Sequence, residues 1–433
     1  MRPAADISVY DRMCWPEAEL EQALAGGAHR RELAAYLGGY EYTTLAALAR
    51  QSEAVRRRRS GRRSRLKIYL LPGILGSQLG RPRSGGEPPD LLWIDPSDIV
   101  KGRLTELRLP PVTQSTPLQP LGAIVYSYLA LKLRLAAAGF DVVLYDYDWR
   151  GDVLASGRAL AQRLAADEAG ELALIGHSMG ALLARAALAQ YGGGAGRISR
   201  LIGMGAPHGG SIAAVQALRA TYPIVGRLAA MDRVHDAEAL TRLAFRGFMS
   251  LYQLLPAASA RLDLFDPESW PQTGARPHPR LLRAARSFGE HLAPPDERFI
   301  SIVGTGQRTV TGIERRGQQF RYQVSSAGDG TVASSCATLP GVRSYSLRCE
   351  HSELPRSQSV AAALIDLLQR GRTRRLRAGV IARHGRRSYV TDAGLRRELG
   401  RKLDWYSLGI GERRVYLDTL NAPPAAYSRR QRA

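Results

Sequence analysis

The pentapeptide Gly-His-Ser-Met-Gly at residues 176–180 constrains this chain most, because it joins two segments of different character. The apolar run Leu172 to Ile175 precedes it and is typical of a buried strand. The Ala- and Leu-rich run Ala181 to Tyr191 follows it and is typical of a helix. A strand that passes directly into a helix needs small residues at the turn, and Gly176 and Gly180 supply them. The chain contains 44 glycines, so the short pattern alone could be accidental, and the flanking strand and helix carry the prediction.

Ser178 stands at the centre of this turn, which has the form of a nucleophile elbow. In such an elbow the serine sits on strained backbone, and we expect its hydroxyl to be exposed above the edge of the sheet. His177 precedes the serine and is assigned, with the two glycines, to the structure of the elbow. The pattern predicts a nucleophilic serine.

A nucleophilic serine needs a base, and in hydrolases with this elbow the acid and then the histidine follow the serine in the chain. Only His351 and His384 lie late enough. His351 lies between the strand-like run Val342 to Leu347 and the helix-like run Val360 to Leu368, at a strand's carboxyl end, where open α/β sheets form their sites. His384 stands among arginines of a basic tail, where a solvated surface explains it. We therefore predict His351 as the base.

Asp329 is the candidate acid, in the sequence Gly328 to Val332. The same Gly-Asp-Gly sequence is also typical of a plain hairpin turn, so on these residues alone both interpretations remain open.

An oxyanion hole is expected where the strand Leu66 to Leu71 runs into the glycine-rich turn Pro72 to Ser77. Acyl transfer places negative charge on the carbonyl oxygen, and two preorganised N–H donors stabilise it. The candidate donors are the backbone amides of Ile74 and of Met179, the residue after the nucleophile.

Six motifs in this order resemble the lecithin:cholesterol acyltransferase-like branch of the α/β-hydrolases, which includes phospholipid:diacylglycerol acyltransferases and phospholipases A. The motifs are Pro72 to Leu79, Tyr147 to Arg150, Ile175 to Gly180, Gly205 to Gly210, Gly328 to Val332, and His351. The resemblance implies an α/β-hydrolase fold with Ser178, Asp329 and His351 as a catalytic triad and Ile74 and Met179 at the oxyanion hole. It covers about Lys67 to Leu368.

Three polar residues near these motifs are assigned structural roles. Asp148 and Arg150 are expected to form a partly buried ion pair that fixes their loop, rather than to orient a substrate. His208 is expected in the wall of a pocket, because it precedes Asp329 and no acid stands beside it in the sequence. Relatives often carry an aromatic residue at its position.

The predicted organisation is a helical, basic N-terminal arm at residues 1–65, a catalytic domain at 66–369, and a basic C-terminal extension at 370–433. Alternating strands and helices in the middle part predict a mostly parallel sheet flanked by helices. An insertion at 81–120 is expected to form a loop or lid, since it contains many prolines. A second insertion, 211–295, has helical periodicity over Leu240 to Leu255 and is expected to form a cap that lines an acyl-chain pocket.

Much of the formal net charge of +22 is concentrated in the two terminal segments. Three explanations remain open: a solvated basic surface, attraction to anionic lipid surfaces, and nucleic-acid binding. Nucleic acid is the least favoured partner, because the sequence has no zinc-ligand spacing, heptad repeat or stacked-aromatic signature. The oligomeric state is left open.

The three cysteines, Cys14, Cys336 and Cys349, are too few and too scattered for a disulfide framework, and they favour a reducing compartment. The first ten residues have no apolar core of a signal peptide, and no apolar run approaches 18 residues, so a cytoplasmic location is expected. We find no metal-ligand cluster or dinucleotide fingerprint and expect no cofactor and no metal.

These features predict a serine α/β-hydrolase, an acyltransferase or lipase, that acts on lipid-like esters through an acyl-enzyme. The residues leave open whether water or an alcohol accepts the acyl group. The alternatives are a general carboxylesterase, a phospholipase without transfer activity, or a non-catalytic protein of lipid surfaces.

Overall fold

The computed structural model describes residues 7–59, 66–109, 117–257, 262–380, 387–399 and 402–420. Within these residues the central sheet has seven strands in the order β12-β11-β8-β7-β6-β1-β5. Its neighbouring strands run parallel except β11 and β12, which pair antiparallel. This mostly parallel sheet confirms the predicted α/β-hydrolase class. The strands are β1 (Leu66–Leu71), β5 (Asp141–Leu144), β6 (Glu171–His177), β7 (Ile198–Met204), β8 (Phe299–Thr305), β11 (Arg343–Arg348) and β12 (Arg377–Ala378).

Helices cover both faces of this sheet. Ile68 and Leu70 of β1 share a core cluster with residues of α6 (Val125–Ala137) and α14 (Gln358–Arg370). Tyr69 and Leu71, which point to the other face, share a cluster with residues of α7 (Val153–Ala165) and α8 (Met179–Gln190). Because both faces are buried, the strands are continuous apolar runs rather than alternating patterns.

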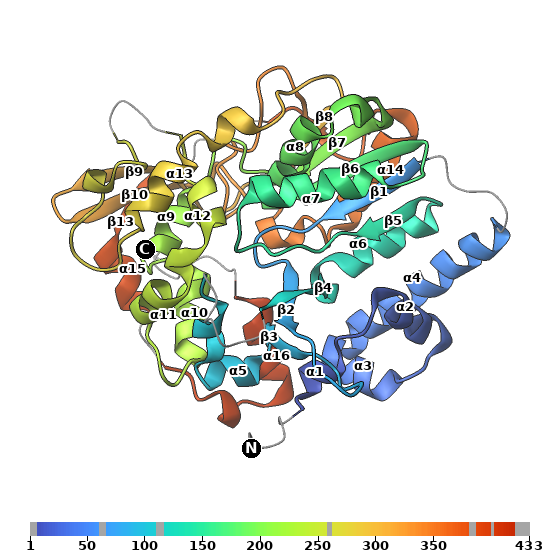
Figure 1. Ribbon diagram of the computed structural model, residues 1–433, viewed down its shortest axis with the longest axis horizontal. Coiled ribbons are helices and arrows are strands. Elements are labelled where there is room, and N and C mark those ends of the chain that lie inside the picture. The colour runs from blue at the N-terminus through green and yellow to red at the C-terminus, as the bar shows by residue number, and fades with distance from the viewer. Residues whose placement is uncertain are drawn as a thin grey trace.

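The N-terminal segment folds into helices that pack on α6. Leucines of these helices, such as Leu24 and Leu45, form a cluster with Leu129 and Leu133 of α6. Figure 1 shows the helices, in blue, gathered beside α6. The basic run begins at the end of α4, and its remainder, residues 60–65, lies outside the described residues. The helices are α1 (Val9–Arg12), α2 (Glu17–Gly26), α3 (Arg30–Leu37) and α4 (Gly39–Arg58).

The insertion at residues 81–120 contains more regular structure than the expected loop. Three strands form a small sheet of order β3-β2-β4. The helix α5 (Pro96–Val100) and the 3-10 turn η1 (Arg103–Leu107) lie between β3 and β4 in the chain. Proline marks the beginning of α5, where a missing N–H costs nothing, and so it does not exclude a helix. The three strands are β2 (Ser77–Arg81), β3 (Asp90–Trp93) and β4 (Gln119–Ala123).

The insertion at residues 211–295 is built from short helices. The periodic stretch over 240–255 is broken into α11, the 3-10 turn η3 (Phe245–Gly247) and α12. Gly247, the last residue of η3, packs closely against the backbone of Leu109. A β-carbon at this position would lie 2.7 Å from the Leu109 carbonyl oxygen, so the contact requires glycine. The helices are α9 (Ile212–Leu218), α10 (Pro223–Met231), α11 (Ala237–Leu243), α12 (Met249–Gln253) and α13 (Pro279–Ala285).

A hairpin that the sequence did not predict, β9 (Thr309–Arg316) and β10 (Gln319–Ser325), follows β8. In the C-terminal extension, β13 (Ser388–Thr391) pairs antiparallel with β10, and α15 (Asp392–Leu399) and α16 (Ile410–Asp418) come after it. The buried carboxylate of Asp392 accepts hydrogen bonds from Arg219 of the cap at 2.9 Å and from Tyr322 of the hairpin at 2.7 Å. The extension is thereby joined to both. Across the described ranges, none of the helices is both long and apolar enough to cross a membrane.

Candidate active site

Ser178 occupies the turn between β6 and α8 with φ 54° and ψ −126°, backbone angles that residues other than glycine rarely adopt. No side chain fits at either flanking glycine. A β-carbon on Gly176 would lie 2.3 Å from the nitrogen of Ala181, and one on Gly180 would lie 2.3 Å from the carbonyl oxygen of Leu71. The two glycines are therefore required by the close approach of strand and helix.

The elbow serine is covered rather than open to solvent. Ser178 is only 6% exposed, so the prediction of a hydroxyl exposed above the sheet is wrong. The turn that follows β1 lies against it, and a β-carbon on Gly73 would be 2.9 Å from the β-carbon of Ser178. The local pattern predicted the elbow but carried no information about this neighbouring turn.

His351 and Asp329 form a hydrogen-bonded pair. The Nδ1–H of His351 donates to Oδ2 of Asp329 at 2.7 Å, and the His351 backbone N–H donates to the Asp329 carbonyl at 2.9 Å. The other carboxylate oxygen of Asp329 accepts from the backbone N–H groups of Thr331 and Val332, at 3.0 and 2.7 Å. This arrangement places the imidazole proton on Nδ1 and leaves Nε2 as a proton acceptor.

The carboxyl ends of β7 and β8 hold this pair in place. Gly205, directly after β7, has φ 58°, and a β-carbon there would lie 3.0 Å from both Asp329 Oδ2 and His351 Nδ1. A β-carbon on Gly304 of β8 would lie 2.7 Å from the β-carbon of Asp329. The end of β7 also contacts the elbow, since the Ser178 N–H donates to the carbonyl of Met204 at 2.8 Å.

His177 brings the elbow and the histidine loop together. Its Nε2 is 3.0 Å from the carbonyl oxygen of His351, and the two rings lie 4.8 Å apart. Ser178, Asp329 and His351 are thus gathered at one edge of the sheet. The alternative base, His384, lies outside the described residues.

The turn after β1 presents the predicted oxyanion donors. It is closed by the hydrogen bond from Gly76 N–H to the Gly73 carbonyl at 3.0 Å, and Leu75 has a positive φ of 63°. In the part of the chain that the structure describes, the N–H groups of Ile74 and Met179 have no hydrogen-bond acceptor. Both amides can therefore donate to a substrate oxygen.

The Tyr147 to Arg150 motif braces this turn. The hydroxyl of Tyr147 donates to the Pro72 carbonyl at 2.9 Å, and the indole N–H of Trp149 donates to the Ser77 carbonyl at 2.9 Å. Arg150 is buried, pairs with Asp148 at 2.6 Å, and donates to the Leu107 carbonyl at 2.9 Å. The ion pair lies in the loop and fixes it.

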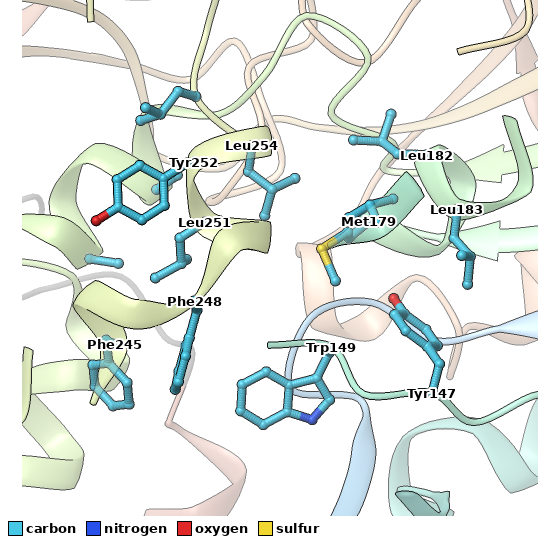
Figure 2. Packing of buried hydrophobic residues seen from close by; sticks show 14 of the residues in the cluster. Tyr147, Trp149, Met179, Leu182, Leu183, Phe245, Phe248, Leu251, Tyr252 and Leu254 are labelled. Atoms are coloured by element: carbon cyan, nitrogen blue, oxygen red, sulfur yellow. The ribbon is translucent and has the colours of Figure 1, made fainter. Parts of the chain in front are cut away.

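Apolar residues of the cap pack against the residues beside the elbow. Phe245, Phe248 and Leu251 are all buried. Phe248 stacks edge-to-face on Trp149 with ring centroids 5.6 Å apart. Figure 2 shows these cap side chains on one side and Trp149 and Met179 on the other. They belong to one buried cluster with Trp149 and Met179.

His208 lies beside a cation. Its Nδ1 is 3.4 Å from the guanidinium of Arg185, a buried residue of α8 that also donates to the Ala293 carbonyl at 3.0 Å. Burial, and then the charge of Arg185, lower the pKa of His208 to about 3. His208 therefore remains neutral near pH 7.

Sequence reasoning missed Tyr128, whose hydroxyl contacts the oxyanion turn and the elbow at once. No local signal marks it, because it is one apolar-face residue of an ordinary helix. Within the described ranges, no group of three or more His, Cys, Asp or Glu side chains is placed to hold a metal ion.

A family model, lecithin:cholesterol acyltransferase, matches residues 139–272, which include the elbow. No curated protein sequence matches the chain. The mature lipase BlEst2 of Bacillus licheniformis is 13% identical, with a TM-score of 0.36, over 70% of this chain and 90% of that one. A chain of the Tle4–Tli4 complex is 14% identical, with a TM-score of 0.42, over 69% of this chain and 97% of that one. Residues 139–272 thus resemble the lecithin:cholesterol acyltransferase family, and the mostly parallel sheet with its strand–elbow–helix turn gives the chain an α/β-hydrolase fold.

Proposed function

We propose that the protein is a serine-dependent acyltransferase or lipase that acts on lipid esters through a covalent acyl-enzyme. Ser178 Oγ attacks the ester carbonyl carbon while His351 Nε2 takes the hydroxyl proton. Asp329 accepts the Nδ1–H bond and stabilises the imidazolium. The ester C–O bond then breaks, and the departing alcohol takes the proton from His351.

The oxyanion of each tetrahedral intermediate is assigned to the N–H groups of Ile74 and Met179. Such donors act without reorganisation because the backbone already holds them, and removing one costs about 3 to 4 kcal/mol in other enzymes. In the second half of the reaction, water or an alcohol loses its proton to His351 and attacks the acyl carbon, and Ser178 leaves with that proton.

One observation carries the proposal: the residue before the strained Ser178, His177, contacts the backbone of His351, and the Nδ1–H bond of His351 to Asp329 leaves its Nε2 as a proton acceptor. Strained backbone of this kind costs about 1 to 3 kcal/mol and persists only where the surroundings enforce it. A protein that merely binds lipid surfaces has no physical need for this combination, which disfavours the non-catalytic alternative.

A fluorophosphonate probe and a p-nitrophenyl acyl ester test the nucleophile. The wild-type protein is expected to be labelled and to turn over the ester, and Ser178→Ala is expected to do neither. Its free energy of unfolding should change by only about 1 kcal/mol, because one hydroxyl is lost. Labelling that persists in Ser178→Ala would remove the assignment, and a wild-type protein that is neither labelled nor active would favour the non-catalytic alternative.

The apolar residues around Met179, and the family match, support lipid esters over small soluble ones. A cap that excludes water favours an alcohol acceptor over water, so transfer to a lipid hydroxyl is expected alongside hydrolysis. Mass spectrometry of products, with a labelled phospholipid donor and a sterol, diacylglycerol or simple alcohol as acceptor, decides the point. Free fatty acid as the sole product with every acceptor would make the protein a lipase or phospholipase. Activity confined to short esters would make it a general carboxylesterase.

A further inference from the structure

A chain of hydrogen bonds joins the oxyanion turn to the backbone of His351. The N–H of Gly73 donates to the hydroxyl oxygen of Tyr128 at 3.0 Å, and that hydroxyl lies 2.9 Å from Nδ1 of His177. On the other side of the same ring, Nε2 of His177 lies 3.0 Å from the carbonyl oxygen of His351. Tyr128 comes from the first turn of α6, and His177 is the last residue of β6.

The two ends of this series of hydrogen bonds, the Gly73 N–H and the His351 carbonyl, determine which group donates and which accepts in each bond. A carbonyl oxygen can only accept, so Nε2 of His177 carries a proton and donates it to His351. A neutral imidazole then has Nδ1 as an acceptor, so the hydroxyl hydrogen of Tyr128 points at His177. The Tyr128 oxygen is left to accept from Gly73, as the 3.0 Å contact requires.

The neutral form of His177 is the one that satisfies the chain. A second proton on Nδ1 would face the Tyr128 hydroxyl, whose own hydrogen would lose its acceptor in a buried site, and an unsatisfied buried donor is unfavourable. Burial, and then the neighbouring charge of His351, lower the pKa of His177 to about 3. A neutral ring 4.8 Å from the His351 ring adds no like charge when His351 becomes an imidazolium.

We propose that His177, with Tyr128 behind it, is a positioning residue for the base: it holds the backbone of His351 at a set distance from the Ser178 elbow and from the oxyanion turn. The inference rests on the proposed function and deepens it. The two hydrogen bonds to Asp329 and the packing against Gly205 fix His351 relative to the acid and to β7, and the hydrogen bond from His177 joins it directly to the elbow.

Side-chain reach provides the test. The amide nitrogen of glutamine extends from Cα about as far as Nε2 of histidine, and that of asparagine extends only about as far as Nδ1. His177→Gln can therefore still donate to the His351 carbonyl, whereas His177→Asn and His177→Phe cannot. We expect kcat for p-nitrophenyl ester turnover to fall about 100-fold in the Asn and Phe variants, since a displacement of about 1 Å can cost that much. The Gln variant should retain kcat within about tenfold of wild type, and KM should change little in all three.

The melting temperatures of the three variants separate positioning from simple loss of packing. If kcat follows melting temperature across the series, or if Gln is no more active than Asn, the positioning role is overturned. A large rise in KM with kcat unchanged would overturn it as well, because the residue would then act on substrate binding.

Tyr128→Phe removes the hydroxyl that connects Gly73 to His177, and Tyr191→Phe is its matched control. Tyr191 is also a buried tyrosine with a hydroxyl that donates to a backbone carbonyl, that of Leu164 at 3.0 Å, but it lies away from the site. Both variants should lose similar stability, and only Tyr128→Phe should lose kcat, by about tenfold or more. Equal kcat in the two variants would contradict the proposal.

The tautomer of His177 can be measured without any turnover, by ¹⁵N NMR of histidine-labelled wild-type protein with His177→Gln for assignment. We expect a neutral, Nε2-protonated imidazole at every pH from about 5 to 8. An Nδ1-protonated or charged ring would overturn the hydrogen-bond chain itself. This readout holds even if the ester assays fail, so failure of the proposed function and failure of the positioning role are distinguishable.

Discussion

Gly205 and His351 are closely packed: a β-carbon built on Gly205 would be 3.0 Å from Nδ1 of the histidine and 2.8 Å from Cδ1 of Leu354, so a neighbour would have to move. The same β-carbon would be 3.0 Å from Oδ2 of Asp329. Gly205, the residue after β7, therefore packs directly against the acid–base pair. Its positive φ of 58° is a second reason for glycine at this position.

Gly205→Ala should disturb this pair and lower kcat by about 100-fold, because the added methyl group displaces His351 or Asp329 by a fraction of an ångström or more. Gly317→Ala is the matched control. Gly317 has the same φ of 58°, but a β-carbon there meets no atom within 4 Å. Both variants carry the strain of a left-handed alanine, and only Gly205→Ala should lose activity in p-nitrophenyl ester turnover. Equal activity in both would mean that the contact with His351 does not matter.

Asp329→Asn should lower kcat by about 10⁴-fold with little change in melting temperature. The asparagine oxygen can still accept from the backbone of Thr331 and Val332, so its amide group is left facing His351 Nδ1. Two hydrogens cannot share that position, so the imidazole is driven to the tautomer with the proton on Nε2, which cannot act as a base. Steady-state kinetics measure the expected fall in kcat, and thermal unfolding of the same preparation measures the expected small change in melting temperature. A variant that unfolds at much lower temperature would instead assign Asp329 to the stability of the loop.

Lowering the pH below about 6.5 should destabilise the protein in part through His208. Its pKa is lowered to about 3 in the folded state, so between these values the unfolded chain binds a proton that the folded chain does not. Stability is then fully present above the unfolded pKa and decreases as pH falls, by up to about 1.4 kcal/mol per pH unit for one histidine. Urea unfolding at a series of pH values should give a shallower slope for His208→Gln than for wild type. The exposed His291 provides the control, and an equal change of slope in His291→Gln would contradict the assignment.

The exposed arginines after α14 are expected to bind anionic vesicles through a face remote from the serine. Helix α14 begins soon after His351, at the carboxyl ends of the parallel strands. It runs 13 residues, about 20 Å, toward the amino ends of those strands. Arg372→Gln combined with Arg374→Gln should weaken binding to phosphatidylserine vesicles, and added salt should weaken it further. Turnover of a soluble ester should be unchanged, because the substituted face is distant. Equal binding to neutral vesicles, or tighter salt-sensitive binding to duplex DNA, would contradict this.

Local features of the site could be predicted from sequence because each depends on neighbours in the chain. The two glycines around Ser178 are required by the collision of one strand with the helix that follows it, and both elements are visible as apolar or Ala-rich runs. The late positions of Asp329 and His351 follow from chain order. The oxyanion turn follows directly from β1.

Contacts between distant segments could not be predicted in the same way. The hairpin β9–β10 separates β8 from Asp329, so the sequence did not show that the acid lies over Gly304. Phe248 of the cap packs edge-to-face on Trp149, which belongs to a distant segment of the chain. Periodicity reports which face of a helix is apolar, but it does not report which partner covers that face.

The sequence by itself therefore determined the strand–turn–helix of the elbow and the parallel sheet, because these depend on backbone preferences and on order along the chain, and it supplied Ser178, Asp329 and His351 as candidates. Only the tertiary structure decided that the serine is covered and that His177 connects Tyr128 to His351. Those hydrogen bonds join residues 49 and 174 positions apart, and their existence depends on how α6, β6 and the loop after β11 pack together rather than on any pattern within one of them.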